Sequence, residues 1–182
     1  MVDLFLAVGL FLLTVAVVGL FAMMGELAAR VPDENVVVAP RPIEEITLGV
    51  TPESWLDGAA HLEGAPVGVL VVLSTSCASC QRIANGSTGD LALPPESFVL
   101  IASGTQERAE SFLAEHPMLR QHRHGIDVEG TWLTRNFGIN ISPSVLIFER
   151  GRLSSAHTFT SATTLPELFA GHHAPIKEES HA

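Results

Sequence analysis

Residues 71–81 read VVLSTSCASCQ, and this stretch decides how the rest of the chain is interpreted. It contains both cysteines of the protein, Cys77 and Cys80, directly after a run of aliphatic residues. A pair with this spacing is a redox-active dithiol, half of a metal site, or two inert buried thiols. The surrounding sequence has to distinguish these three alternatives.

Cys77 lies where a predicted buried strand ends and a predicted helix begins. The first turn of a helix has free backbone N–H groups and a partial positive charge, and both favour a thiolate over a thiol. Cys80 lies one turn further along the same helix, within reach of the Cys77 sulfur. One reactive thiolate followed by one more deeply placed resolving thiol is the arrangement that a dithiol exchange cycle needs.

The apolar pattern around this pair predicts an α/β domain. Continuous aliphatic runs of strand length are typical of strands that are buried on both faces, and they occupy residues 67–73, 98–102 and 145–148. Helices are predicted at residues 77–84, 105–115, 130–137 and 165–170, with Thr105 as an N-cap and Gly138 as a C-cap. Gly151 turns the third strand into a hairpin with residues 153–159. The order predicts a mixed central sheet with helices on both faces.

The metal interpretation lacks ligands. Structural zinc usually takes four, and the chain has no second cysteine pair. A copper site could be completed by a histidine, because soft thiolates and imidazole suit that metal, and the candidates are His122, His124 and His157. We expect no cofactor, and a copper-handling function remains the main alternative to redox chemistry.

A second feature favours the redox interpretation. The segment ISPS precedes the strand at residues 145–148, and a proline at the mouth of a strand is confined to edges and special bends. X–Pro bonds are where cis peptides occur. A cis Pro143 would hold the backbone of Ser142 beside the cysteine pair.

The segments VLVVLSTSCASCQRI and NFGINISPSVLIFERGRL, with this order of elements, resemble the thioredoxin fold. More narrowly, they resemble the membrane-anchored bacterial thiol–disulfide oxidoreductases of cytochrome maturation and methylamine utilisation. The resemblance implies that Cys77 and Cys80 are the catalytic pair and that Pro143 is the cis-proline. It also implies that Ser142 faces the substrate, with Ser76 standing where many relatives have tryptophan next to the first cysteine.

Outside this domain, the N-terminus predicts a membrane anchor. Residues 4–24 carry no charge and only one polar side chain, Thr14. A helix rises ~1.5 Å per residue and a bilayer core is ~30 Å thick, so this run is long enough to span once. A cleaved signal peptide is the competing interpretation, but no basic residue precedes the run. We therefore divide the chain into an anchor (1–25), a tether (26–42), a thioredoxin-like domain (43–170) and a flexible tail (171–182).

Charge limits the partners. The net charge is −10, without a basic stripe, which argues against nucleic-acid binding. Arg30 and Arg41 after the span weakly favour a cytoplasmic domain, whereas the resemblance implies the extracytoplasmic side of a single-pass cell-membrane protein.

We therefore expect a membrane-anchored enzyme that exchanges thiols and disulfides with cysteine-containing envelope proteins. The resemblance implies a membrane redox partner for recycling, and the N-terminal helix would contact lipid. Reductase, oxidase and isomerase activities all remain open. The alternatives are a copper chaperone of the same fold and a redox-inert scaffold.

Overall fold

The computed structural model describes residues 9–10, 13–21, 23, 38–44 and 46–170, and the chain divides into two units, residues 1–36 and 37–182. In the first unit the described residues are helical, and Thr14 Oγ1 donates a hydrogen bond to the carbonyl of Leu10 at 2.8 Å. Within the described ranges, no helix combines the length and the apolar character needed to cross a membrane. Parts of the predicted anchor, most of the tether and the whole tail lie outside the described residues.

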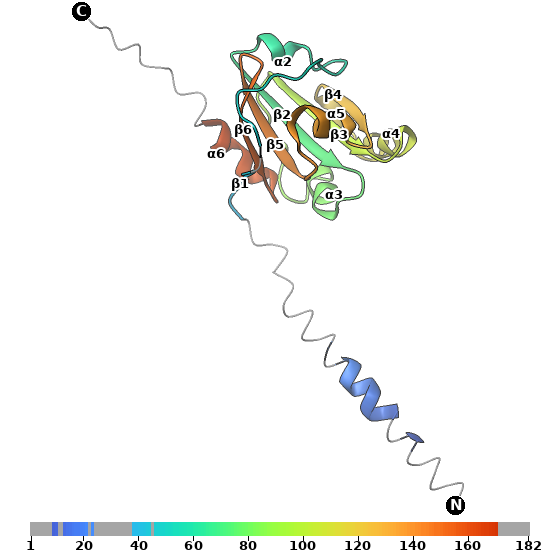
Figure 1. The fold of residues 1–182 in the computed structure, drawn as a ribbon. Coiled ribbons are helices and arrows are strands. Elements are labelled where there is room, and N and C mark those ends of the chain that lie inside the picture. The colour runs from blue at the N-terminus through green and yellow to red at the C-terminus, as the bar shows by residue number, and fades with distance from the viewer. Residues whose placement is uncertain (1–8, 11–12, 22, 24–37, 45, 171–182) are drawn as a thin grey trace, which may run out of the picture. The chain divides into compact units, whose positions relative to one another are not determined.

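The second unit is built on a six-stranded mixed sheet with the strand order β1-β6-β5-β2-β3-β4 (Figure 1). The strands are β1 (Arg41–Pro42), β2 (Val67–Ser74), β3 (Ser97–Ser103), β4 (His124–Val128), β5 (Ser144–Glu149) and β6 (Arg152–Thr158). β3 runs parallel to its neighbours β2 and β4. β5 runs antiparallel to β2 and β6, and β1 runs antiparallel to β6.

Helices cover both faces of this sheet. They are α2 (His61–Gly64), α3 (Ala78–Ala84), α4 (Gln106–Glu115), α5 (Thr131–Phe137) and α6 (Leu165–Ala170). Buried side chains of α3, α4 and α6 belong to one hydrophobic cluster, and those of α2 and α5 belong to another. The sheet therefore separates two cores.

The central strand β2 shows why an unbroken aliphatic run was needed. Successive side chains of a strand point to opposite faces. Val69, Val71 and Leu73 accordingly join the cluster of α3, while Leu70 and Val72 join the cluster of α5. A strand with a core on each side has no solvent-facing position left for a polar residue.

The predicted architecture is confirmed: a thioredoxin-like α/β fold with a mixed sheet and helices on both faces. The local signals also behave as predicted. Thr105 accepts a hydrogen bond from the N–H of Arg108 at 3.2 Å and caps α4. Gly138 ends α5 with a φ of 69°, and Gly151 turns the β5–β6 hairpin with a φ of 75°.

Two parts of the prediction were wrong. β4 was missed, so the helices α4 and α5 are separated by a strand that pairs with β3. Its sequence HGIDV carries no aliphatic run, and its one buried side chain is that of Asp127. The sheet also begins at Arg41, inside the predicted tether, because a short edge strand tolerates Pro42.

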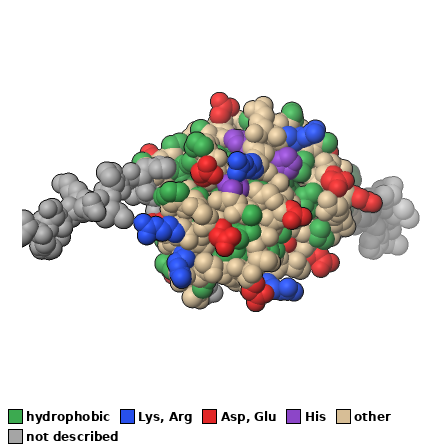
Figure 2. All heavy atoms as spheres, turned by 90° about the horizontal axis from the view of Figure 1, so that it is seen from above, with side chains coloured by type: hydrophobic (Ala, Val, Ile, Leu, Met, Phe, Trp, Pro, Cys, Tyr) green, Lys and Arg blue, Asp and Glu red, His purple; other side chains and the backbone are tan. Residues whose placement is uncertain are grey.

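Figure 2 shows how charged side chains are distributed over one face of the molecule. On the face seen in Figure 2, acidic and basic side chains are interspersed, and the basic ones do not gather into a stripe. Proteins that bind nucleic acids present clustered Lys and Arg. This face offers no such cluster.

Candidate active site

Cys77 occupies the N-cap position of α3. Its backbone is extended (φ −98°, ψ 121°), and its Sγ accepts a hydrogen bond from the N–H of Cys80 at 3.3 Å. The Cys77 side chain is half-buried, so a partner can reach it. The sulfur thus satisfies one of the backbone donors that every helix start leaves free.

Cys80 lies in a different environment, although it is only one turn away. Its side chain is 0 % exposed and packs into the core beside Ile83 and Ala84. Burial raises the pKa of the Cys80 thiol to about 12, and its hydrogen bond and charge interaction with Cys77 add to the rise. Cys80 therefore stays protonated at neutral pH while Cys77 is accessible.

The loop before β5 reaches the cysteine pair. The Ser142–Pro143 peptide bond is cis, as the resemblance implied. The thiol of Cys77 donates a hydrogen bond to the carbonyl oxygen of Ser142, with a sulfur–oxygen distance of 3.5 Å. Pro143 is buried at the start of β5. The fold therefore brings together Cys77, Cys80, Ser142 and Pro143, while the substrate-facing roles of Ser142 and Pro143 stay predictions.

Ser76 belongs to an exposed lead-in to the helix. Its N–H donates to Ser74 Oγ at 3.3 Å, and the two hydroxyl oxygens lie 3.1 Å apart. Ser76 itself is exposed. It lies next to Cys77 in the chain, and its contact with a substrate stays a prediction.

The described structure does not form a metal site from the predicted ligands. Among the described residues, no group of three or more His, Cys, Asp or Glu side chains is arranged to hold a metal ion. His124 is the first residue of β4 and its Nδ1 lies 2.9 Å from the carbonyl oxygen of His122, which precedes the strand, while His157 lies in β6. The copper alternative therefore has no assembled three-ligand site in this part of the chain.

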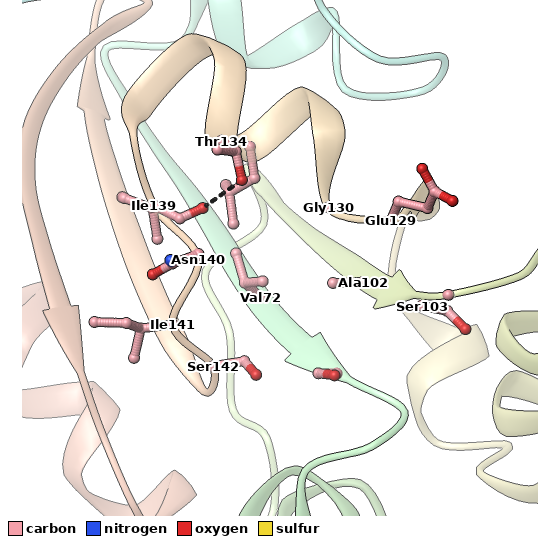
Figure 3. A pocket seen from close by; sticks show the side chains of 13 residues that line it. Val72, Ala102, Ser103, Glu129, Gly130, Thr134, Ile139, Asn140, Ile141 and Ser142 are labelled. Carbon is pink, nitrogen blue, oxygen red and sulfur yellow. Dashed lines mark hydrogen bonds between the residues drawn. The ribbon is translucent and has the colours of Figure 1, made fainter.

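Sequence reasoning missed a cavity beside the cysteines. It has a volume of about 280 Å³ and lies between the ends of β2 and β3, the start of α5 and the loop before Pro143 (Figure 3). Ser74 and Ser142 line it, and because Ser142 contacts Cys77 the cavity adjoins the cysteine pair. The turn Glu129–Gly130, with two successive left-handed residues, was the available sequence signal.

Asp127 fixes the wall of this cavity. Its carboxylate is buried and accepts hydrogen bonds from the N–H groups of Trp132 and Leu133 at 3.0 and 2.9 Å. These two donors belong to the first turn of α5, which would otherwise leave them unsatisfied. The start of α5 is thereby tied to the end of β4.

The comparisons with known proteins show only structural likeness. No family model and no curated protein matches the chain. Solved structures do match, and the following three are all bacterial. DsbF of Mycobacterium tuberculosis, in mixed oxidised and reduced forms, is 20% identical, with 61% of this chain and 83% of that chain covered and a TM-score of 0.48.

A secreted Mycobacterium tuberculosis disulfide oxidoreductase homologous to Escherichia coli DsbE is 18% identical, with 69% of this chain and 92% of that chain covered and a TM-score of 0.45. StoA from Bacillus subtilis is 14% identical, with 70% and 98% covered and a TM-score of 0.42. At these values the fold assignment rests on the strand order and connections described above.

Proposed function

We propose that the chain is a membrane-anchored thiol–disulfide oxidoreductase that acts on cysteines of envelope proteins. The observation that carries the proposal is the inequality of the two thiols. Cys77 is accessible at a helix start, whereas Cys80 is buried and protonated. The backbone nitrogen of Cys80 lies 3.3 Å from Cys77 Sγ, so the two residues are neighbours. Inert structural cysteines have no need of this division.

The reaction follows from the two positions. The Cys77 thiolate attacks a substrate disulfide, forms a mixed disulfide and expels one substrate thiolate. Cys80 then loses its proton and attacks Cys77 Sγ, which releases the second substrate thiol. Two enzyme thiols become one disulfide, and one substrate disulfide becomes two thiols. The same steps in reverse oxidise a substrate, and a dithiol or disulfide partner in the membrane restores the starting state.

The high pKa of Cys80 is partly relieved when it has to react. Burial is its largest cause and persists, but the hydrogen bond and the charge interaction with Cys77 also raise it. Once Cys77 is held in a mixed disulfide, its sulfur carries no charge and cannot serve as a thiolate acceptor. The pKa of Cys80 then falls, so that the resolving thiol is activated by the formation of its own target.

The substrate docks beside Ser142 and Pro143, with Ser76 on the other side of Cys77. The 3.5 Å contact between Cys77 Sγ and the Ser142 carbonyl oxygen supports this arrangement. An extended substrate segment next to this backbone can pair with it in the manner of an added strand. Its sulfur would then be presented to Cys77.

The redox chemistry is tested with the full-length chain and glutathione. Reduced wild-type chain mixed with oxidised glutathione should form the Cys77–Cys80 disulfide and release two glutathione thiols. Cys80→Ser should instead stop at a glutathione adduct on Cys77, detected by mass, and Cys77→Ser should form no adduct. An adduct of equal yield on Cys80 in the Cys77→Ser chain would overturn the assignment of roles.

The membrane anchor and the extracytoplasmic location are part of the same proposal. They are supported by the uncharged run at residues 4–24. A reporter enzyme that works only in the cytoplasm, fused after Ala182, should be inactive. An active fusion would place the domain on the cytoplasmic side. Full cellular function after replacement of both cysteines would instead favour the scaffold alternative.

A further inference from the structure

Beside the redox pair, the cavity between β2, β3 and α5 has features that the exchange reaction itself does not use. It reaches from Ser142, which contacts Cys77, across the ends of the central strands to the turn before α5 (Figure 3). A polypeptide whose cysteine is at Cys77 must therefore place neighbouring side chains at or near this cavity.

The floor of the cavity is apolar, whereas its rim combines an aliphatic and a charged side chain. Val72, Leu133 and Ile139 form apolar lining that is almost completely buried. At the rim, the large aliphatic side chain of Ile141 is 47 % exposed and so remains available to a partner. A volume of about 280 Å³ suits a single large side chain rather than an extended ligand.

Glu129 is the one charged residue of this lining and stands across the cavity from Ile141 (Figure 3). Its φ is 60°, a left-handed conformation that glycine adopts at less cost. Within the part of the chain that the structure describes, no cation pairs with its carboxylate. An exposed carboxylate that a left-handed backbone holds at the edge of a cavity reaching Ser142 is a reason to look for a function.

Arg150, the other described non-glycine residue with a positive φ, serves as a comparison for Glu129. Arg150 has a φ of 51° in the β5–β6 hairpin, at the opposite end of the sheet from Cys77. Both positions carry the same backbone strain, and both precede a glycine. Only Glu129 lines the cavity that adjoins the redox pair, so the two residues form a matched pair for experiment.

We propose that this cavity selects the protein substrate: it takes one large apolar side chain near the substrate cysteine, while Glu129 pairs with a neighbouring Lys or Arg. The proposal rests on the proposed oxidoreductase function and names the substrate class for the same site. The favoured occupant is an extended segment that combines cysteine with apolar and basic residues. The chain's own net charge of −10 adds a general attraction for basic segments, which the variants below separate from the local effect.

The test uses four synthetic peptides joined through cysteine to 2-nitro-5-thiobenzoate. The parent is Gly-Arg-Leu-Ser-Cys-Ser-Leu-Arg-Gly, which is symmetric so that no chain direction is assumed. In the others, Leu becomes Ser, Arg becomes Glu, or both change. Cys77 attacks the peptide sulfur and expels the coloured thiolate, and Cys80 then displaces the peptide thiol, so that two enzyme thiols are oxidised as one disulfide is reduced.

The readout is a ratio of second-order rate constants for two peptides with the same full-length variant, which cancels changes in intrinsic thiol reactivity. The ratio of the rate constant for the Arg peptide to that for the Glu peptide should be about 2–5-fold higher in wild type than in the Glu129→Gln variant, as expected for an exposed ion pair. Glu129→Lys should lower the Arg over Glu ratio below that of Glu129→Gln, because a positive charge then stands at this position. Ile141→Ser, an exposed change, should lower the Leu over Ser ratio by about 3-fold. Arg150→Gly should change neither ratio.

The outcomes separate the two proposals. If wild type releases no thiolate from any peptide beyond the Cys77→Ser background, the oxidoreductase function fails and the docking proposal fails with it. If all four peptides react at one rate, or Glu129→Lys leaves the Arg over Glu ratio where it was, the enzyme stands and the cavity is not its selection site. Glu129→Gln makes the net charge less negative and Arg150→Gly makes it more negative, so a shift of that ratio by Arg150→Gly of equal size and opposite direction would show general electrostatics alone and also overturn the proposal.

Discussion

The two ends of the central sheet are packed in opposite ways. Where β2 begins, glycines are used to let elements approach closely: a Cβ on Gly68 would lie 2.9 Å from Leu62 Cδ2, and one on Gly151 would lie 2.8 Å from the carbonyl oxygen of Glu63. Where β2 ends, the chain leaves a cavity, a half-buried Cys77 and an exposed Ile141. We call the first the closed end because its elements approach so closely, although a surface pocket of about 480 Å³ lined by Glu63, Arg150 and Gly151 adjoins it, and we call the second the open end because its cavity reaches Ser142 beside Cys77.

Stability and reactivity therefore depend on different ends of the sheet. Close packing at the β2 start holds α2 against β2 and against the turn of the β5–β6 hairpin, and each lost contact there weakens folding. Open packing at the β2 end leaves room for a partner and places a sulfur where it can be reached. Mutations at the closed end should change folding, and mutations at the open end should change chemistry.

The largest expected effect is loss of exchange at the open end. Cys77→Ser should reduce the rate of glutathione exchange by on the order of 10³-fold or more, because a hydroxyl neither forms nor breaks a disulfide. The free energy of unfolding should change by less than about 1 kcal/mol, since serine is a preferred N-cap and keeps the helix start satisfied. Urea unfolding followed by the fluorescence of Trp55 and Trp132 checks the second part.

At the closed end, Gly151→Ala should lower the free energy of unfolding by about 2–4 kcal/mol. Its Cβ meets a backbone oxygen at 2.8 Å, and its φ of 75° disfavours any side chain. Alkylation of Cys77 in the folded protein should keep its wild-type rate.

Gly130→Ala at the open end is the matched control for this change. Gly130 has a φ of 65°, but a Cβ there meets nothing within 4 Å. Only the backbone strain remains, so the free energy of unfolding should fall by about 1 kcal/mol. Equal losses at Gly130 and Gly151 would remove the contrast between the two ends.

The third prediction concerns pH and Cys80. The pKa of this thiol is raised from 9.0 to about 12 in the folded chain, mainly by burial. Because the folded pKa lies above the unfolded one, its contribution is complete below about pH 9 and is lost as the pH rises towards 12. The reduced chain should therefore lose about 1.4 kcal/mol of unfolding free energy per pH unit between pH 9 and 11.

Cys80→Ala and the oxidised chain should both lack this slope, which separates it from the titration of other groups. The protein has no tyrosine, so thiolate formation can be followed by ultraviolet absorbance without a phenolate background. If both thiols of the folded reduced chain, and therefore also Cys80, titrate completely below pH 9.5, the assigned environment of Cys80 is contradicted.

The smallest expected effect compares the two strained residues. Glu129→Gly and Arg150→Gly each relieve a positive φ, so each should raise the free energy of unfolding by about 0.5–1 kcal/mol. Their stability gains should be similar, because the strain is similar. Only Glu129→Gly should alter peptide preference. A loss of stability in either variant would show that its side chain contributes more than its backbone strain removes.

The sequence predicted those elements whose formation depends on local pattern. The aliphatic runs gave β2, β3 and β5, and Thr105 and Gly138 marked helix ends that the structure confirms. β4 was missed because it is stabilised by pairing with β3 and its own sequence has no aliphatic run. Gly125 leaves space for Phe98, since a Cβ at this position would lie 2.8 Å from the Phe98 ring. α2, with four residues, is too short for any periodic signal.

The site divides in the same way. The cysteine pair could be predicted because Cys77 and Cys80 are one helical turn apart. Ser142 is 65 residues from Cys77, and its place beside the cysteines depended on a cis bond at Pro143, which, like its substrate-facing role, was implied by the resemblance to a fold. The role that we infer for Glu129 was out of reach, because a cavity is formed only when β2, β3 and α5 are assembled.

The attachment of β1 has a mechanical consequence. Arg41 and Pro42 pair with β6, and the same edge continues through hydrogen bonds from Ile43 N–H to the Ala156 carbonyl and from Gly49 N–H to the Leu153 carbonyl. These bonds follow one another along the chain, so a force that pulls the N-terminal segment away from β6 breaks them one after another and not all at once. The segment would peel from β6 before β2 or β5 is strained, and the cysteine pair would be shielded from tension applied at the N-terminus.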